Sequence, residues 1–197
     1  MDLEIEAKFV KVNHDEMRKK LRSVGAECRQ PMRLMRRVIY HRPNDNDSFI
    51  RVRDEGSAVT LTYKHFHDAN SIDGVEEVET RVDDFDKAVR ILDETGMNRD
   101  AYQETKRETW DRNGVEIVLD EWPWLEPFIE IEGPDEESVR LMAEELGFDW
   151  SDAVFGGVSS VYTKTYKSMG TPDQAAIIIN KKTPVIRFED PVPRAFK

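Results

Sequence analysis

Residues 4–8 read EIEAK, with a charged side chain at every second position and apolar neighbours between. Glu4, Glu6 and Lys8 therefore point to one side of any extended backbone. Because successive side chains of a strand face opposite ways, this alternation predicts a β-strand over residues 3–9 with one apolar and one charged face. One such face is more often a solvated surface than a site, so its meaning depends on whether other strands repeat it.

The charged alternation returns in several later segments. The repeated charges are Arg51, Arg53, Lys64, Glu77, Glu79, Arg107, Asp120, Glu130 and Glu132. Like charges that are neighbours along a strand face repel one another, so repeating them on several strands would destabilise the sheet repeatedly. A barrel with a charged interior would offset this repulsion, because the acidic side chains could bind Mg²⁺ or Mn²⁺ and the Arg and Lys side chains could bind phosphate oxygens. We therefore predict an interior site for a polyphosphate, in a barrel of eight strands, which is wide enough for a small ligand.

The order of the predicted elements indicates an α+β fold. Helical spacing of apolar residues appears within residues 13–27, 83–96 and 134–148. The strands between them give the order β-α-ββββ-α-βββ-α, which lacks the βαβ alternation of a parallel sheet. We expect residues 1–167 to form the domain and residues 168–197 an extension packed on it, with short strands conceivable at 175–180 and 184–188.

Composition excludes several classes of protein. The 197 residues include 29 Lys and Arg against 40 Asp and Glu, a net charge of −11, which argues against a nucleic-acid binder. Cys28 is the single cysteine, so neither an intrachain disulfide nor a multi-cysteine zinc site is expected. The sequence shows no secretory leader and no membrane-spanning apolar run, so we expect a cytoplasmic protein without membrane contact. A homodimer is compatible with the sequence.

Other chemistries have weaker signals. There is no GxxxxGK[ST] loop and no GxSxG elbow. His65 and His67 share a strand face and could hold a metal, but that face is opposite Lys64, and a surface role is favoured. Trp122 and Trp124 could stack on a base, although a packed connection is the favoured interpretation.

The segments EIEAK, IRVR, LTYK, EEVE, KRETW, VLD and FIEIEG, in this order over roughly residues 1–165, resemble the CYTH family, also called triphosphate tunnel metalloenzymes. The resemblance implies a closed antiparallel eight-stranded barrel whose charged interior binds a triphosphate and a divalent metal. Its members include class IV adenylyl cyclases, thiamine triphosphatases and inorganic triphosphatases.

The resemblance also assigns roles by position. The implied ligands of Mg²⁺ or Mn²⁺ are Glu4, Glu6, Asp120, Glu130 and Glu132. The implied triphosphate contacts are Lys8, Arg51, Arg53, Lys64 and Arg107, with Glu77 and Glu79 orienting these bases or holding a second metal. Lys8 or an interior carboxylate is the candidate proton acceptor. Two positions depart from the family pattern. Thr105 stands where the family often has a lysine two residues before Arg107, and strand alternation points the neighbouring Lys106 away from Arg107. The second strand carries Arg36 and Arg37 where the family often has an acidic residue, and either arginine could face inward.

Hydrolysis and cyclisation would use the same apparatus. We favour hydrolysis of an inorganic or organic triphosphate, such as tripolyphosphate, thiamine triphosphate or ATP, because no polar motif for reading adenine and ribose is evident. The alternatives are a class IV adenylyl cyclase, which converts ATP to cyclic AMP and pyrophosphate, and a non-catalytic binder of phosphorylated ligands.

Overall fold

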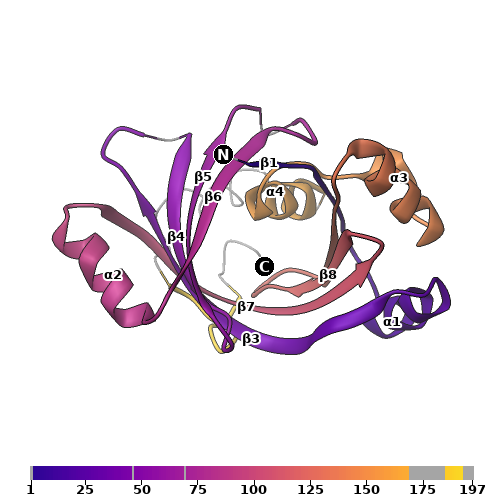
Figure 1. Cartoon of the computed structure of the whole chain (residues 1–197), viewed down its shortest axis with the longest axis horizontal. Helices are drawn as coiled ribbons and strands as arrows, with labels where there is room; N and C mark the ends of the chain where they lie inside the picture. Colours follow the sequence, from indigo (N-terminus) through magenta and orange to yellow (C-terminus); the bar gives the residue numbers. More distant parts are fainter. Residues whose placement is uncertain (1, 46, 69, 169–184, 193–197) are drawn as a thin grey trace.

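The computed structural model describes residues 2–45, 47–68, 70–168 and 185–192. In chain order its elements are β1 (Asp2–Glu4), β2 (Glu6–Phe9), α1 (His14–Ser23), β3 (Glu27–His41), β4 (Ser48–Asp54), β5 (Val59–Phe66), β6 (Val75–Val82), α2 (Phe85–Glu94), β7 (Asn98–Arg112), β8 (Val115–Glu121), β9 (Phe128–Glu132), α3 (Glu136–Glu145), the 3₁₀ turn η1 (Trp150–Asp152), α4 (Val158–Ser168) and β10 (Val185–Ile186). Figure 1 shows the strands curved around a central space, with α2 outside one side and α1 and α3 outside the other.

The strands form one sheet in the order β1-β6-β5-β4-β3-β7-β8-β9-β2, with β10 added beside β7. The prediction of a large antiparallel sheet with helices is confirmed. The prediction of a closed eight-stranded barrel was wrong, because the described residues form ten strands and the pairing order ends at β1 and β2. Those two ends are consecutive in the chain and are separated by Ile5 alone.

The backbone at Ile5 explains the difference. β1 pairs with β6 and β2 pairs with β9, so the predicted single strand over residues 3–9 changes partners halfway. At the break, the Glu6 N–H donates to the Ile72 carbonyl at 3.2 Å and the Gly133 N–H donates to the Ile5 carbonyl at 3.1 Å. The interrupted strand still directs Glu4, Glu6 and Lys8 to the same inner space.

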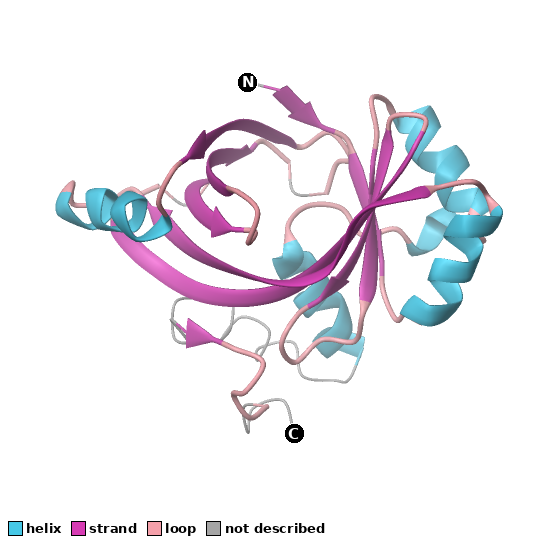
Figure 2. Cartoon of the chain, turned by 60° about the horizontal axis from the view of Figure 1, so that its bottom comes forward, coloured by secondary structure: helices cyan, strands magenta, loops and turns pink. Residues whose placement is uncertain are grey.

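The three predicted helices are confirmed, and each begins at a polar capping residue. Asn13, Asp84 and Asp135 accept hydrogen bonds from the first-turn N–H groups of α1, α2 and α3. Helices α1 and α3 cover the outer apolar faces of β2, β8 and β9, where Leu21 and Val139 join the same buried cluster as Ile131. Helix α2 packs over β3 and β4 on the other side (Figure 2). The apolar outer faces leave the charged faces to line the interior.

Helix α4 was not predicted. Its segment is rich in β-branched residues, which lower helix propensity, and so local signals did not indicate it. Tertiary packing stabilises it instead: Val161, Tyr162 and Tyr166 are buried against the β8–β9 connection at Trp122 and Phe128. The Tyr162 hydroxyl also donates to the Pro123 carbonyl at 2.7 Å.

The C-terminal residues that the structure describes lie along β7. β10 pairs in parallel with Tyr102 and Gln103, which confirms a short strand within 184–188. Ile186 is buried there, and the Trp124 indole N–H donates to the Asp190 carbonyl at 3.1 Å. The conceivable strand at 175–180 lies outside the described residues. Within the described part of the chain, every helix is too short or too polar to cross a bilayer.

Candidate active site

The inner face of the sheet lines a cavity of about 1040 Å³. This volume is at the upper end of the range for small-molecule sites, about 300–1,000 Å³. All the residues with predicted site roles line it: Glu4, Glu6, Lys8, Arg51, Arg53, Lys64, Glu77, Glu79, Arg107, Asp120, Glu130 and Glu132. Strand alternation accounts for this, because the intervening apolar residues are the ones buried under the helices.

Three carboxylates meet at one side of the cavity. Oxygens of Glu6, Glu130 and Glu132, which we call the acidic group, lie within 4.8 Å of one another. Burial and the charge of Glu130 raise the pKa of Glu6 to about 8. Burial and the same neighbour raise the pKa of Glu132 to about 7. These two carboxylates therefore favour uptake of a proton or a cation, and their oxygen donors are those that Mg²⁺ and Mn²⁺ prefer.

Glu130 differs from its two neighbours because bases surround it. Burial alone would raise the pKa of Glu130, but the charges of Lys8 and Arg107 lower it below its ordinary value. The Arg107 guanidinium lies 3.4 Å from the Glu130 carboxylate, and the Lys8 ammonium lies 3.8 Å from it. Glu130 thus releases its proton at lower pH than its two neighbours and brings a negative charge to the acidic group.

Lys8 is held on two sides. Its ammonium donates to a Glu6 oxygen at 2.5 Å and to the Gly156 carbonyl at 2.8 Å. Burial would lower the pKa of Lys8, but Glu130 and Glu6 raise it above its ordinary value. A lysine that keeps its proton cannot accept one, so this environment argues against Lys8 as the proton acceptor and favours a role as a fixed positive charge.

Two predicted metal ligands lie apart from the acidic group. Glu4 accepts two hydrogen bonds from the Lys64 ammonium, at 2.5 and 2.6 Å. Asp120 accepts two from the Arg107 guanidinium, at 2.8 and 2.6 Å. Each of these two carboxylates is thereby paired with a basic side chain. In the described part of the chain, neither joins the cluster of Glu6, Glu130 and Glu132.

Four arginines crowd the neighbouring part of the cavity. We call Arg37, Arg51, Arg53 and Arg107 the arginine group. The Nε atoms of Arg37, Arg51 and Arg53 are buried without a hydrogen-bond partner among the described residues. Burial and the charges of Arg51 and Arg53 lower the pKa of Arg37 well below its ordinary value, and burial with Arg53 lowers that of Arg51 to about 10. An anion placed here would relieve both the repulsion and the missing hydrogen bonds.

The structure separates the ambiguous bases. Arg37 faces the cavity, where it donates to the Thr105 hydroxyl at 3.0 Å and lies 4.5 Å from the Trp122 ring centre. Arg36 faces outward to Asp54 at 3.0 Å. Lys106 also lies outside the cavity, 3.1 Å from Glu121, as strand alternation predicts. Arg37, which the sequence alone does not distinguish from Arg36, therefore belongs to the arginine group.

Glu116 is a cavity residue to which the sequence analysis gave no role. It lies opposite Glu132 in the β8–β9 register and lines the cavity beside the acidic group. Burial raises its pKa, and the charge of Arg107 partly offsets the rise. Strand alternation could have predicted this position, because Glu116 lies four residues before Asp120 and therefore shares its strand face.

Apolar side chains also line one end of the cavity. Phe49 and Phe66 lie there with ring centres 5.8 Å apart, and Ile39 lies on the same side of Arg37 along β3. His41 lies at this end, with one ring nitrogen 2.8 Å from the Ser48 carbonyl and the other 3.3 Å from Asp100. The cavity therefore has room for an uncharged group as well as for charged ones.

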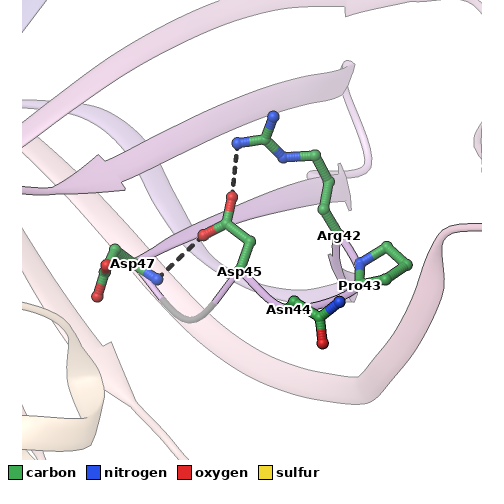
Figure 3. Close-up of a pocket in the computed structure, with 5 residues that line it drawn as sticks. All are labelled: Arg42, Pro43, Asn44, Asp45 and Asp47. Carbon is green, nitrogen blue, oxygen red and sulfur yellow. Dashed lines mark hydrogen bonds and ion pairs between the residues drawn. The ribbon is translucent and has the colours of Figure 1, made fainter.

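A shallow hollow also occurs at the β3–β4 connection, next to the cavity, and Asp47 lines both (Figure 3). Its charged members bind one another: the Asp45 carboxylate accepts from the Arg42 guanidinium and from the Asp47 N–H. The Ser48 hydroxyl and Arg42 lower the pKa of Asp45 to about 2. The polar groups of this loop therefore bind one another, and we assign it no ligand.

Comparison with known proteins identifies the family. The family model of the CYTH domain matches residues 2–153. The chain belongs to the CYTH family. Its CYTH fold is similar to that of the PH1819 protein from Pyrococcus horikoshii, with 30% sequence identity, 74% of this chain and 91% of that chain covered, and a TM-score of 0.61. None of the curated proteins compared with the chain matches it.

Two further solved structures share the CYTH fold with lower identity. The PH1012 protein from Pyrococcus horikoshii has 23% identity, covers 77% of this chain and 94% of its own, and gives a TM-score of 0.67. A protein from Vibrio parahaemolyticus, called a "putative adenylate cyclase", has 16% identity, covers 81% of this chain and 97% of its own, and gives a TM-score of 0.69. At these identities the likeness concerns the fold alone.

Proposed function

We propose that this protein hydrolyses an inorganic or organic triphosphate with the help of Mg²⁺ or Mn²⁺. The observation that carries the proposal is the pairing of two charge groups in one cavity. The arginine group has unpartnered buried Nε atoms, and the acidic group beside it contains carboxylates with raised pKa values. The first needs an anion and the second needs a cation, and a metal–triphosphate complex supplies both.

The arginine group supplies the phosphate contacts. Guanidinium groups bind phosphate oxygens through paired, charge-assisted hydrogen bonds. Arg107 contacts both Asp120 and Glu130, so it stands at the boundary between the two charge groups. Lys64 and Lys8 add fixed positive charge near the acids. The triphosphate would therefore extend from the arginine group toward the acidic group.

Glu6, Glu130 and Glu132 would hold the metal, because carboxylate oxygens that converge within 4.8 Å fit a hard divalent cation. The metal supplies neutralisation of the charge that develops on the phosphate oxygens during transfer. Glu116 lies next to this group without belonging to it, and its raised pKa suits a proton acceptor for the attacking water. Asp120 positions Arg107 through two hydrogen bonds.

A class IV adenylyl cyclase is the second candidate, and the apolar end of the cavity favours it. Phe49 and Phe66 could pack against a base, which tripolyphosphate does not have. The neighbour from Vibrio parahaemolyticus carries a cyclase name, although it supports the fold only. Cyclisation needs the ribose oxygen directed at the α-phosphorus, whereas hydrolysis needs water at the terminal one.

The deciding experiment incubates purified protein with tripolyphosphate, thiamine triphosphate or ATP, with Mg²⁺ or Mn²⁺, and separates the products by chromatography. Orthophosphate and a diphosphate are expected. Cyclic AMP would show the cyclase instead, and tight metal-dependent binding without turnover would show a binder. Glu132→Gln should abolish the metal-dependent activity, whereas Glu144→Gln, an exposed glutamate on α3, should retain it.

A further inference from the structure

A second cluster of metal-ligating side chains lies on the opposite face of the β5–β6 hairpin. His65 and His67 alternate with Lys64 and Phe66, which line the cavity, so the two imidazoles face outward. Glu76 lies directly opposite His65 in the β5–β6 register. None of these three residues lines the cavity.

The three side chains converge. The His67 Nε2 atom lies 3.0 Å from a Glu76 carboxylate oxygen, and the rings of His65 and His67 meet edge to face with centres 4.4 Å apart. One potential ligand atom from each side chain lies within 4.8 Å of the other two. Ligand atoms around a tetrahedral zinc ion are about 3.3 Å apart, given Zn–N and Zn–O distances of about 2.0–2.2 Å. The His67–Glu76 distance already fits, and small side-chain rotations would bring in His65.

The backbone of the hairpin end holds this arrangement in place. The His67 and Asp68 N–H groups both donate to the Gly74 carbonyl, at 2.9 and 3.3 Å, which closes the connection between β5 and β6. A Cβ atom at Gly74 would meet the Asp68 carbonyl oxygen at 1.7 Å, so the turn tolerates only glycine there. The main chain therefore fixes the backbone of His67 close to that of Glu76.

We infer that His65, His67 and Glu76 form a surface binding site for a divalent transition metal, with Zn²⁺ the best-fitting ion. Two imidazoles and a carboxylate are the donor set of zinc sites that keep one open position. Imidazole donors suit zinc, copper and nickel, whereas all-carboxylate sites suit magnesium and manganese. The outer site thus differs in chemistry from the acidic group, and its bound ion would join β5 to β6.

The test measures Zn²⁺ binding to the whole protein by calorimetry, in excess Mg²⁺ so that the inner carboxylates are occupied. One zinc ion per chain is expected, with affinity at least tenfold weaker in His65→Asn, His67→Asn and Glu76→Gln. Because bound zinc joins two strands, it should also raise the melting temperature of the wild type and not of these variants.

Two controls keep this site distinct from the cavity. Glu132→Gln should leave zinc binding in excess Mg²⁺ unchanged, and His67→Asn should leave any Mg²⁺-dependent triphosphate turnover unchanged. Circular dichroism checks that each variant is folded, and Cu²⁺ electron paramagnetic resonance should show coupling to two imidazole nitrogens. Zinc binding that survives both histidine substitutions, or no zinc binding in excess Mg²⁺, would overturn the inference.

Discussion

Replacing Glu132 with glutamine removes a carboxylate from the cavity wall while keeping its size and shape. In the folded protein burial, followed by the charges of Glu130, Glu4 and Glu116, raises the pKa of Glu132 from 4.5 to about 7. A shift of about 2.5 units corresponds to about 3.4 kcal/mol, at about 1.36 kcal/mol per unit, as an upper bound on the cost of ionising this group in the metal-free fold.

The sign follows from proton binding. Between pH 4.5 and 7 the folded protein holds a proton on Glu132 that the unfolded chain has released, so this group lowers stability as pH rises through that window. Below the window both states are protonated and the cost vanishes; above it the full cost is present. We expect Glu132→Gln to be more stable than the wild type by about 1–3 kcal/mol at pH 8, and equally stable near pH 4.5.

The assay is urea unfolding followed by circular dichroism at pH 4.5, 6 and 8, with a chelator present because a bound metal would stabilise the wild type. Glu144→Gln is the matched control, since it is exposed on α3 and should show no such trend. A Glu132→Gln protein that is less stable than the wild type at pH 8, or a difference that does not change with pH, would refute the reasoning.

Three other outcomes follow from the cavity. Mn²⁺ affinity should rise by more than about tenfold between pH 6 and pH 8, because Glu6 and Glu132, whose pKa values are raised to about 8 and about 7, must release their protons to bind the metal. Calorimetry that finds pH-independent affinity would contradict this. Arg37→Met should weaken tripolyphosphate binding about ten- to a hundredfold, because a hydrogen bond to a charged group contributes about 1.5–3 kcal/mol. The control is Arg36→Met, which changes an outward-facing arginine and should bind tripolyphosphate normally in the same titration. Tyr162→Phe should cost about 1 kcal/mol in thermal unfolding, since it removes the hydrogen bond to Pro123; an unchanged midpoint would mean that this bond does not hold α4.

Much of the fold and the membership of the cavity could be predicted from the sequence, because both depend on local periodicity. Alternation along a strand sends Arg51 and Arg53 to one face whatever the rest of the chain does. Local signals also indicate the turn at Asn113-Gly114, whose φ angles of 55° and 83° suit a tight hairpin, and Asn13 as the polar cap of α1. These features need only neighbours in sequence.

The grouping of the charges depended on strands far apart in the chain. Glu6, Glu130 and Glu132 converge because β2 pairs with β9 in one particular register, while Asp120 is held by Arg107 across β7 and β8. No local pattern distinguishes these acids from one another, since each alternates with apolar residues in the same way.

The sequence by itself determined which side chains share a strand face, because a backbone period of two is a property of each strand alone. Only the tertiary structure decided that the sheet ends at the two halves of one interrupted strand, that α4 packs beside the cavity, and that Arg37 rather than Arg36 faces it. Each of these outcomes rests on hydrogen bonds or burial between segments distant in sequence. Such contacts form only when the whole chain folds.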